Sequence, residues 1–241
     1  ATGATVRLDF SGAAPLARVY LDGALQPAGT FSSSHASGIF TGSGAFSSAA
    51  PENIFAWAAG SGNWSSASNW ESAAAPSGGQ NLALLFPLGA AGAYTNDLGS
   101  PFTLNSLWAA GAATNQSARI GGNGLLFTNT AAGVKPSLKL SGSGAAELAA
   151  PLSAHADLSF DSADAVTVSG TLSFPLTNSY VVSKTGAGAV TLASVSGSPG
   201  CYTVYEGLLT FGGVHTGSRP ISSAGPFAGL PAAVVINSLP G

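Results

Sequence analysis

Charged side chains are scarce in this chain of 241 residues. Lys, Arg, Asp and Glu make up 7% of the sequence, with a formal net charge of −3, whereas about a quarter of the residues in an average globular domain are charged. The seven Lys and Arg residues form no basic cluster. Since nucleic-acid binding depends on clustered positive charge, this composition argues against a nucleic-acid partner.

Cysteine and long apolar runs are scarce as well. Cys201 is the single cysteine, so no internal disulfide can form, and its simplest role is that of a small apolar filler. No apolar run reaches the roughly 18 residues of a membrane helix, since the longest candidate is broken by Pro87, Gly89 and Gly92. The first ten residues lack the charged start and apolar core of a secretory signal. We therefore expect a chain that does not span a membrane, and that is either not exported or has lost its signal.

Helix signals are nearly missing, whereas strand signals occur throughout. No stretch of about twelve residues keeps a 3.6-residue apolar period without an interrupting Gly, Pro or Ser cluster. Short segments with a period of two are common, and examples are residues 6–10, 17–21, 137–140, 165–168 and 171–174. Turn-forming pairs and clusters separate them, at 22–23, 141–144, 169–170, 186–188 and 212–213. The pattern predicts an all-β chain.

The spacing of the turns favours a solenoid over a two-sheet sandwich. From about Leu138 onward, a strand that ends in a small-residue turn returns every ten or so residues. Coils that stack on one axis have this regularity, and we expect Ala, Ser and Gly to fill a narrow core between them. We predict a right-handed parallel β-helix over residues 51–241, preceded by a small antiparallel β unit at 1–50.

Three segments resemble the autotransporter-associated β-strand repeats of bacterial surface proteins. The first holds Trp57, Trp64 and the Asn69-Trp70 pair before the strand LALLF, and is similar to the family's tryptophan-rich opening. The second, TNDLGSPFTLNSLWAAG, resembles the rung pair that follows. The third, KTGAG followed by VTL and later by VYEGLLTFGG, resembles the repeat signature. The sequence departs from the family's pattern at Glu71 and Cys201.

The resemblance also bears on the order of the parts and on function. Residues 6–46 resemble a unit that closes an array in such proteins, although here it comes first, and the C-terminal stretch reads as the start of another rung. We expect the chain to be one piece or one period of something longer or self-joining. The resemblance implies an extracellular or cell-surface structural protein, not an enzyme, that adheres or joins head-to-tail into fibres. Its partners would be further copies, other surface or matrix components, or a polysaccharide.

Few groups are available for catalysis or metal binding. His35, His155 and His215 lie far apart, with no neighbouring ligands at metal spacing. His155 and Asp157 would share one face of a strand, where they form an ion pair, a weak metal site or, as we favour, a solvated pair. Asp157, Asp161 and Asp164 form the one acidic cluster, which suits either a polysaccharide-cleaving β-helix enzyme or, more simply, turns. No catalytic residue, metal or cofactor is predicted.

The remaining candidates are aromatic. A flat β surface with exposed tryptophans would suit sugar rings, as in a carbohydrate-binding adhesin. We instead favour Trp57, Trp64 and Trp70 as bulky cover at the start of the solenoid, because large aromatic residues are on average well buried. Gly121-Gly122-Asn123-Gly124 is similar to a calcium-binding repeat, but Leu126 stands where that repeat needs Asp, so a hydrated turn is expected. The structural or interaction candidates are Trp57, Trp64, Trp70, Trp108 and Cys201.

Overall fold

Strands one coil apart pair in parallel and in register, at intervals that range from 19 residues, between Tyr202 and Ile221, to 32 residues, between Gly62 and Tyr94. The computed structural model describes residues 5–16, 19–21, 24–26, 29–48, 53–87, 92–110, 117–141, 145–175, 179–197, 200–212, 221–223 and 233–237. Within this part, Ser137 pairs with Ser159, 22 residues later, and Val182 pairs with Tyr202, 20 residues later. Each such step completes one coil. The chain is therefore a parallel β-solenoid, as the turn spacing predicts.

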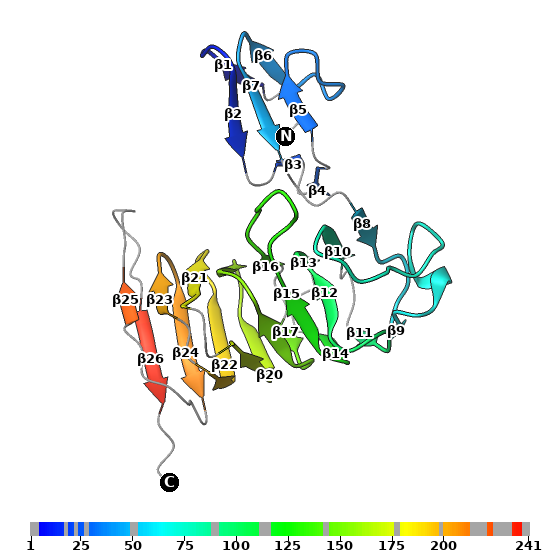
Figure 1. The fold of residues 1–241 in the computed structure, drawn as a ribbon, viewed down its shortest axis with the longest axis vertical. Coiled ribbons are helices and arrows are strands. Elements are labelled where there is room, and N and C mark those ends of the chain that lie inside the picture. Colours follow the sequence, from blue (N-terminus) through cyan, green and yellow to red (C-terminus); the bar gives the residue numbers. More distant parts are fainter. Residues whose placement is uncertain are drawn as a thin grey trace.

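Two long sheets form the walls of the solenoid, and every strand pair in them is parallel. The eight-stranded sheet contains β8 (Asn53–Ala56), β10 (Leu82–Pro87), β13 (Ser106–Ala110), β16 (Ser137–Ser141), β19 (Leu158–Ser162), β21 (Val181–Thr185), β23 (Cys201–Val204) and β25 (Ile221–Ser223). The eleven-stranded sheet contains β9 (Gly62–Asn63), β11 (Gly92–Asn96), β12 (Phe102–Leu104), β14 (Ser117–Gly122), β15 (Leu125–Phe127), β17 (Ala145–Leu148), β18 (Leu152–Ala154), β20 (Val166–Ser173), β22 (Ala189–Ser196), β24 (Leu208–Gly212) and β26 (Ala233–Asn237). Figure 1 shows the coils succeeding one another from β8 and β9 to β25 and β26.

Alternation along the strands places large apolar side chains inside, and small hydroxyl side chains take many of the outward positions. Leu84, Leu107, Leu138 and Phe160 form one inward column, and each is fully buried. The buried cluster consists mainly of Leu, Val, Phe, Tyr and Trp. The expectation that Ala, Ser and Gly fill a narrow core is therefore wrong for the described residues. In these strands many of the small residues face outward, which is one reason why the chain needs so few charges.

The outward positions of four strands, β16, β19, β20 and β21, show this most clearly. Ser137, Ser159 and Ser183 pair in register on adjacent strands of the eight-stranded sheet. Strand β20 alternates buried apolar positions with exposed or half-buried hydroxyl positions over its whole length. Hydroxyl groups satisfy the polar outer face without introducing charge.

Strand β20 also corrects one sequence-based expectation. The Ser169-Gly170 pair does not end a strand: β20 continues through it, with a shift in register between Val168 and Thr171. A Cβ atom on Gly170 would lie 2.1 Å from the carbonyl oxygen of Ala150. Glycine is needed here for close approach to the neighbouring coil at a bulge, and not for a turn. By contrast, Gly186, with φ of +79°, lies in the predicted turn between β21 and β22.

The first seven strands form separate small sheets. They are β1 (Val6–Leu8), β2 (Ala13–Leu16), β3 (Tyr20–Leu21), β4 (Ala24–Leu25), β5 (Gly29–Ser32), β6 (Phe40–Gly42) and β7 (Ala45–Ser48). Pairs β3–β4 and β5–β7 are antiparallel, as expected, but β1–β6 and β2–β7 are parallel, so the unit is mixed. Leu8, Val19, Phe31 and Phe40 form its own buried cluster. The expected turns at 22–23 and 142–144 lie outside the described residues. The only helix among the described residues is a 3-10 turn, Ala67–Asn69.

Backbone contacts between coils make a precise prediction for glycine. Gly122 has a φ of +94°, and a Cβ atom there would lie 2.2 Å from the carbonyl oxygen of Asn96 on the preceding coil. A Cβ atom on Gly79 would have no such neighbour within 4 Å. We expect Gly122→Ala to lower the free energy of unfolding by about 2 kcal/mol or more, through backbone strain and the clash. Gly79→Ala should change it by less than about 0.5 kcal/mol. Urea denaturation of the two variants measures both, and equal effects would contradict the assigned register.

Candidate functional site

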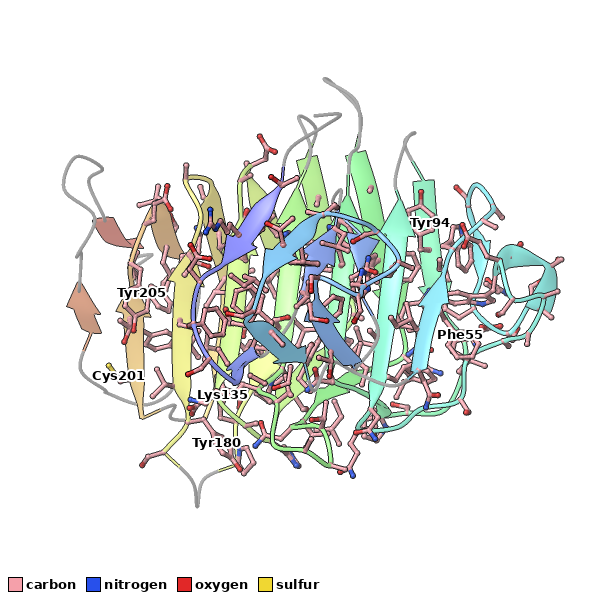
Figure 2. All side chains as sticks on the ribbon, turned by 90° about the horizontal axis from the view of Figure 1, so that it is seen from above. Phe55, Tyr94, Lys135, Tyr180, Cys201 and Tyr205 are labelled. Atoms are coloured by element: carbon pink, nitrogen blue, oxygen red, sulfur yellow. The ribbon has the colours of Figure 1, made fainter. Side chains whose placement is uncertain are left out.

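The tryptophan-rich segment packs against the first coils as a closed aromatic cluster. Trp57, Trp64 and Trp70 are each at most 2% exposed. An antiparallel bridge joins Trp57 to Trp70, and their rings meet edge to face with centroids 4.9 Å apart. The next coils add Phe86 and Phe102, whose ring centroids lie 5.5 and 5.6 Å from that of Trp64. In Figure 2, the labelled Phe55 and Tyr94 lie near this end of the solenoid.

Hydrogen bonds fix two of the three indoles. Trp57 Nε1 donates to the carbonyl oxygen of Gly60 at 2.8 Å, and Trp70 Nε1 donates to that of Trp64 at 2.9 Å. Trp64 Nε1 is buried and has no hydrogen-bond partner among the described residues. Buried to this degree, the three rings offer no open face to a sugar. They cover the core where the first coil would otherwise expose it to water.

The loop that carries the indoles is tied to the following coil through Asp97. Its carboxylate accepts hydrogen bonds from the backbone N–H of Ser65 at 2.8 Å and from the Ser65 hydroxyl at 2.5 Å. Slight burial opposes ionisation of Asp97, but these bonds outweigh it and hold the pKa of the carboxyl below its usual value. The backbone N–H of Trp64 also donates to Thr95, at 2.9 Å.

The unequal hydrogen bonding of Trp64 and Trp70 gives a matched pair of tests. Trp70→Phe and Trp64→Phe remove the same volume from one aromatic cluster. Only Trp70→Phe also removes a donor from a buried carbonyl, that of Trp64, so we expect it to cost about 1–3 kcal/mol more in unfolding free energy. Chemical denaturation followed by tryptophan fluorescence measures the difference. If Trp64→Phe proved the more damaging, the hydrogen-bond assignment would be wrong.

Trp108 differs from the other three tryptophans. It lies on the outward side of β13, is half-buried, and has Lys139 Nζ of the next coil 5.6 Å from its ring centroid. Cys201 is half-buried at the start of β23, where its Sγ lies 3.4 Å from the carbonyl oxygen of Tyr202 and 3.7 Å from Thr203 Oγ1. Figure 2 places Cys201 toward the opposite end of the solenoid from Phe55.

Asp157 and Asp161 do not form a close pair of carboxylates. His155 and Asp157 lie between β18 and β19 and not within a strand, and Asp157 pairs with Lys135 at 2.7 Å. Asp157 and Asp161 are four residues apart along an extended segment, which corresponds to about 13 Å. Paired carboxylates of glycoside hydrolases lie roughly 5–9.5 Å apart. No group of three potential metal ligands occurs among the described residues.

The electrostatics of Asp157 are also those of a structural group. Burial raises the pKa of its carboxyl, but the ammonium of Lys135 and the backbone N–H of Val181, which donates at 2.9 Å, more than compensate. The pKa of Asp157 is therefore below its usual value. A general acid needs the opposite shift.

The other sequence candidates have structural partners. His35 Nδ1 lies 2.8 Å from the Ser37 hydroxyl, and its ring packs 4.8 Å from that of Phe31; His215 lies outside the described residues. At the glycine-rich turn of 121–124, Asn123 N–H donates to the carbonyl oxygen of Asn96 at 2.7 Å, and Asn96 Nδ2 donates back to that of Asn123 at 2.9 Å. Reciprocal asparagine bonds between coils thus occupy the position where a hydrated turn was expected.

A shallow cavity of about 310 Å³ lies beside the tryptophan-rich loop. Residues 76–78 line one side and residues 98–103, except Ser100, line the other. None of the lining side chains is ionisable. The cavity therefore contains no acid, base or charged nucleophile for chemistry of its own.

The sequence reasoning missed Lys184, the one charged side chain that is fully buried among the described residues. It occupies the inward column between Phe160 and Val204. Burial lowers the pKa of its ammonium to about 8, although the charges of Asp161 and Glu206 act in the opposite direction. The sequence pattern indicates this burial, because the period of two that buries Val182 also points residue 184 inward.

Among the described residues, no helix has the length and apolar character needed to cross a membrane. No family model, curated protein or solved structure matches the chain. The resemblance to autotransporter-associated repeats therefore stays a prediction.

Proposed function

We propose that this chain is a non-enzymatic structural section of a bacterial cell-surface or extracellular-matrix protein, which adheres or assembles head-to-tail. The observation that carries the proposal is the uninterrupted stacking of coils over one apolar core, from Trp57 at one end to Phe211 near the other. A solenoid of stacked coils of this kind suits projection or scaffolding. The sequence resemblance supports an exported location.

The distribution of ionisable groups supports a non-enzymatic role. The carboxylates of Asp157 and Glu147 are engaged by Lys135 and Arg119 at 2.7 and 3.3 Å. The described cavity has no ionisable lining. Active sites instead gather groups with perturbed pKa values around a concave site.

The geometry of the coil edges supports assembly along the axis. Within the described part, β8 and β25 lie at opposite edges of the eight-stranded sheet, and each has one partner strand. Among the described residues, the second edge of β25 carries backbone N–H and C=O groups that can bond an incoming strand. On β8 the carbonyl oxygen of Ala56 already accepts from the N–H of Glu71 at 2.9 Å, so only the part of that edge before Ala56 is open to a strand. Pairing the two different edges of successive copies would be heterologous, and a heterologous contact that does not close on itself produces a filament.

Assembly is tested on the purified 241-residue chain. We expect the mass measured by light scattering to rise with protein concentration, and cryo-electron microscopy to show filaments with the coil axis along the fibre. A monomeric mass at all concentrations, with single short rods in the images, would reject assembly of this chain. The non-enzymatic part of the proposal would survive that result.

A carbohydrate-binding adhesin is the second candidate, and the outward placement of Trp108 favours it. Soluble xylan, pectin or peptidoglycan fragments should then shift the tryptophan fluorescence of the folded chain. Trp108→Ala should weaken binding at least about tenfold, which corresponds to loss of a stacking contact worth roughly 1.5 kcal/mol. Tyr205→Ala, which removes another partly exposed aromatic ring, serves as the control. Unchanged fluorescence with every polysaccharide would reject this candidate for these ligands.

A further inference from the structure

The ammonium of Lys184 is held inside the solenoid by backbone carbonyl groups. Lys184 is 0% exposed, and its Nζ donates to the carbonyl oxygens of Thr185 at 2.6 Å and Gly186 at 2.5 Å. Both carbonyls belong to the corner that follows β21 in its own coil. A third carbonyl, that of Glu206, lies 3.4 Å from Nζ and belongs to the corresponding corner of the next coil.

Backbone hydrogen bonds between the same two corners lie beside this contact. The N–H of Tyr205 donates to the carbonyl oxygen of Lys184 at 2.9 Å, and the N–H of Leu208 donates to that of Gly188 at 3.2 Å. Lys184 therefore contacts both of the corners that these two backbone hydrogen bonds join. Opening of this contact can be followed at the amides of Tyr205 and Leu208.

Two carboxylates supply the charges that act on the buried ammonium. Asp161 lies on β19, in the preceding coil, and Glu206 lies in the turn between β23 and β24. Asp161 is also the in-register neighbour of Lys139 on β16. Burial nonetheless dominates, so the pKa of Lys184 falls to about 8, within reach of mildly alkaline conditions.

We propose that Lys184 is a pH-sensitive tie between successive coils, which joins the β21–β22 corner to the β23–β24 corner in its protonated form and releases the second corner when it loses a proton. An ammonium group has three N–H donors and meets three carbonyl acceptors. A neutral amine has two. The two short bonds to Thr185 and Gly186 use both of them, so the long contact with Glu206 is the one that is lost.

As pH rises, loss of the Lys184 proton should open the corner locally but increase the contribution of Lys184 to the free energy of global unfolding. The two effects can therefore be distinguished. The pKa of Lys184 is lower in the folded chain than in the unfolded chain, where it has its ordinary value of 10.5. Between about pH 8 and 10.5 the unfolded state therefore binds more protons, and the contribution of Lys184 to the free energy of unfolding rises with pH. Increased opening at the corner over this interval is then local.

Hydrogen exchange tests the tie in the wild-type chain. Protection factors of the Tyr205 and Leu208 amides, corrected for intrinsic exchange, are measured between pH 7 and 10, and the ionisation of Lys184 is followed by the chemical shift of its ε-carbon. We expect protection at both amides to fall about fivefold as Lys184 deprotonates, in line with the loss of one hydrogen bond. The amide of Asn123, which bonds to Asn96 at a corner between earlier coils, should not change.

Variants identify the responsible group. Lys184→Met keeps the length of the side chain without its donors, so its protection at Tyr205 and Leu208 should already be low at pH 7 and should not vary up to pH 10. Lys135→Met, which removes a largely exposed lysine, should keep the wild-type response. A pH response that persists in Lys184→Met would overturn the proposal. So would constant protection in the wild-type chain while Lys184 titrates, a result that needs no variant to fold.

Discussion

Parallel, in-register hydrogen bonding between coils is the constraint on which the rest of this structure depends. Each strand must lie beside the strand one coil earlier, so residues one coil apart share one environment. Inward columns then repeat apolar side chains, and outward columns repeat hydroxyl side chains. The same constraint brings the backbones of successive coils into close contact, and this explains why glycine is needed at the end of β14 (position 122) and at the bulge in β20 (position 170).

A stacked column also requires every coil to supply a compatible residue, and the exceptions are informative. The column that contains Leu138 and Phe160 continues with Lys184 before it returns to Val204. A charge in such a place costs free energy unless its hydrogen bonds are made. Two carbonyl groups at the end of its own strand, those of Thr185 and Gly186, and one in the corner of the next coil, that of Glu206, supply those bonds. The corner geometry of the solenoid therefore allows a lysine to be buried.

The start of the solenoid raises a different problem, because the first coil has no predecessor to cover its interior. The indoles of Trp57, Trp64 and Trp70 provide that cover, and the Asp97 carboxylate anchors the segment that carries them. Their burial separates them from Trp108, which lies on an outward position of the sheet. Three tryptophans are thus buried as structural cover, whereas Trp108 is a candidate for surface binding because it lies on the outward face of its strand.

The alternation of apolar and polar residues, with turns at regular intervals, was enough to predict an all-β solenoid and strands such as β10 and β16, because period and turn chemistry are local properties. The tertiary structure decided what depends on neighbours one coil away. From the sequence Gly170 is expected in a turn, but the structure shows that it makes room for the carbonyl group of Ala150. From the sequence Asp157 belongs to an acidic cluster, but in the structure it pairs with Lys135. Lys184 obeys the period that the sequence displays, and the carbonyl groups of Thr185 and Gly186 that it bonds are its neighbours in the sequence. Only the stacking of coils buries it and brings the carbonyl of Glu206 to it, because that residue belongs to the next coil.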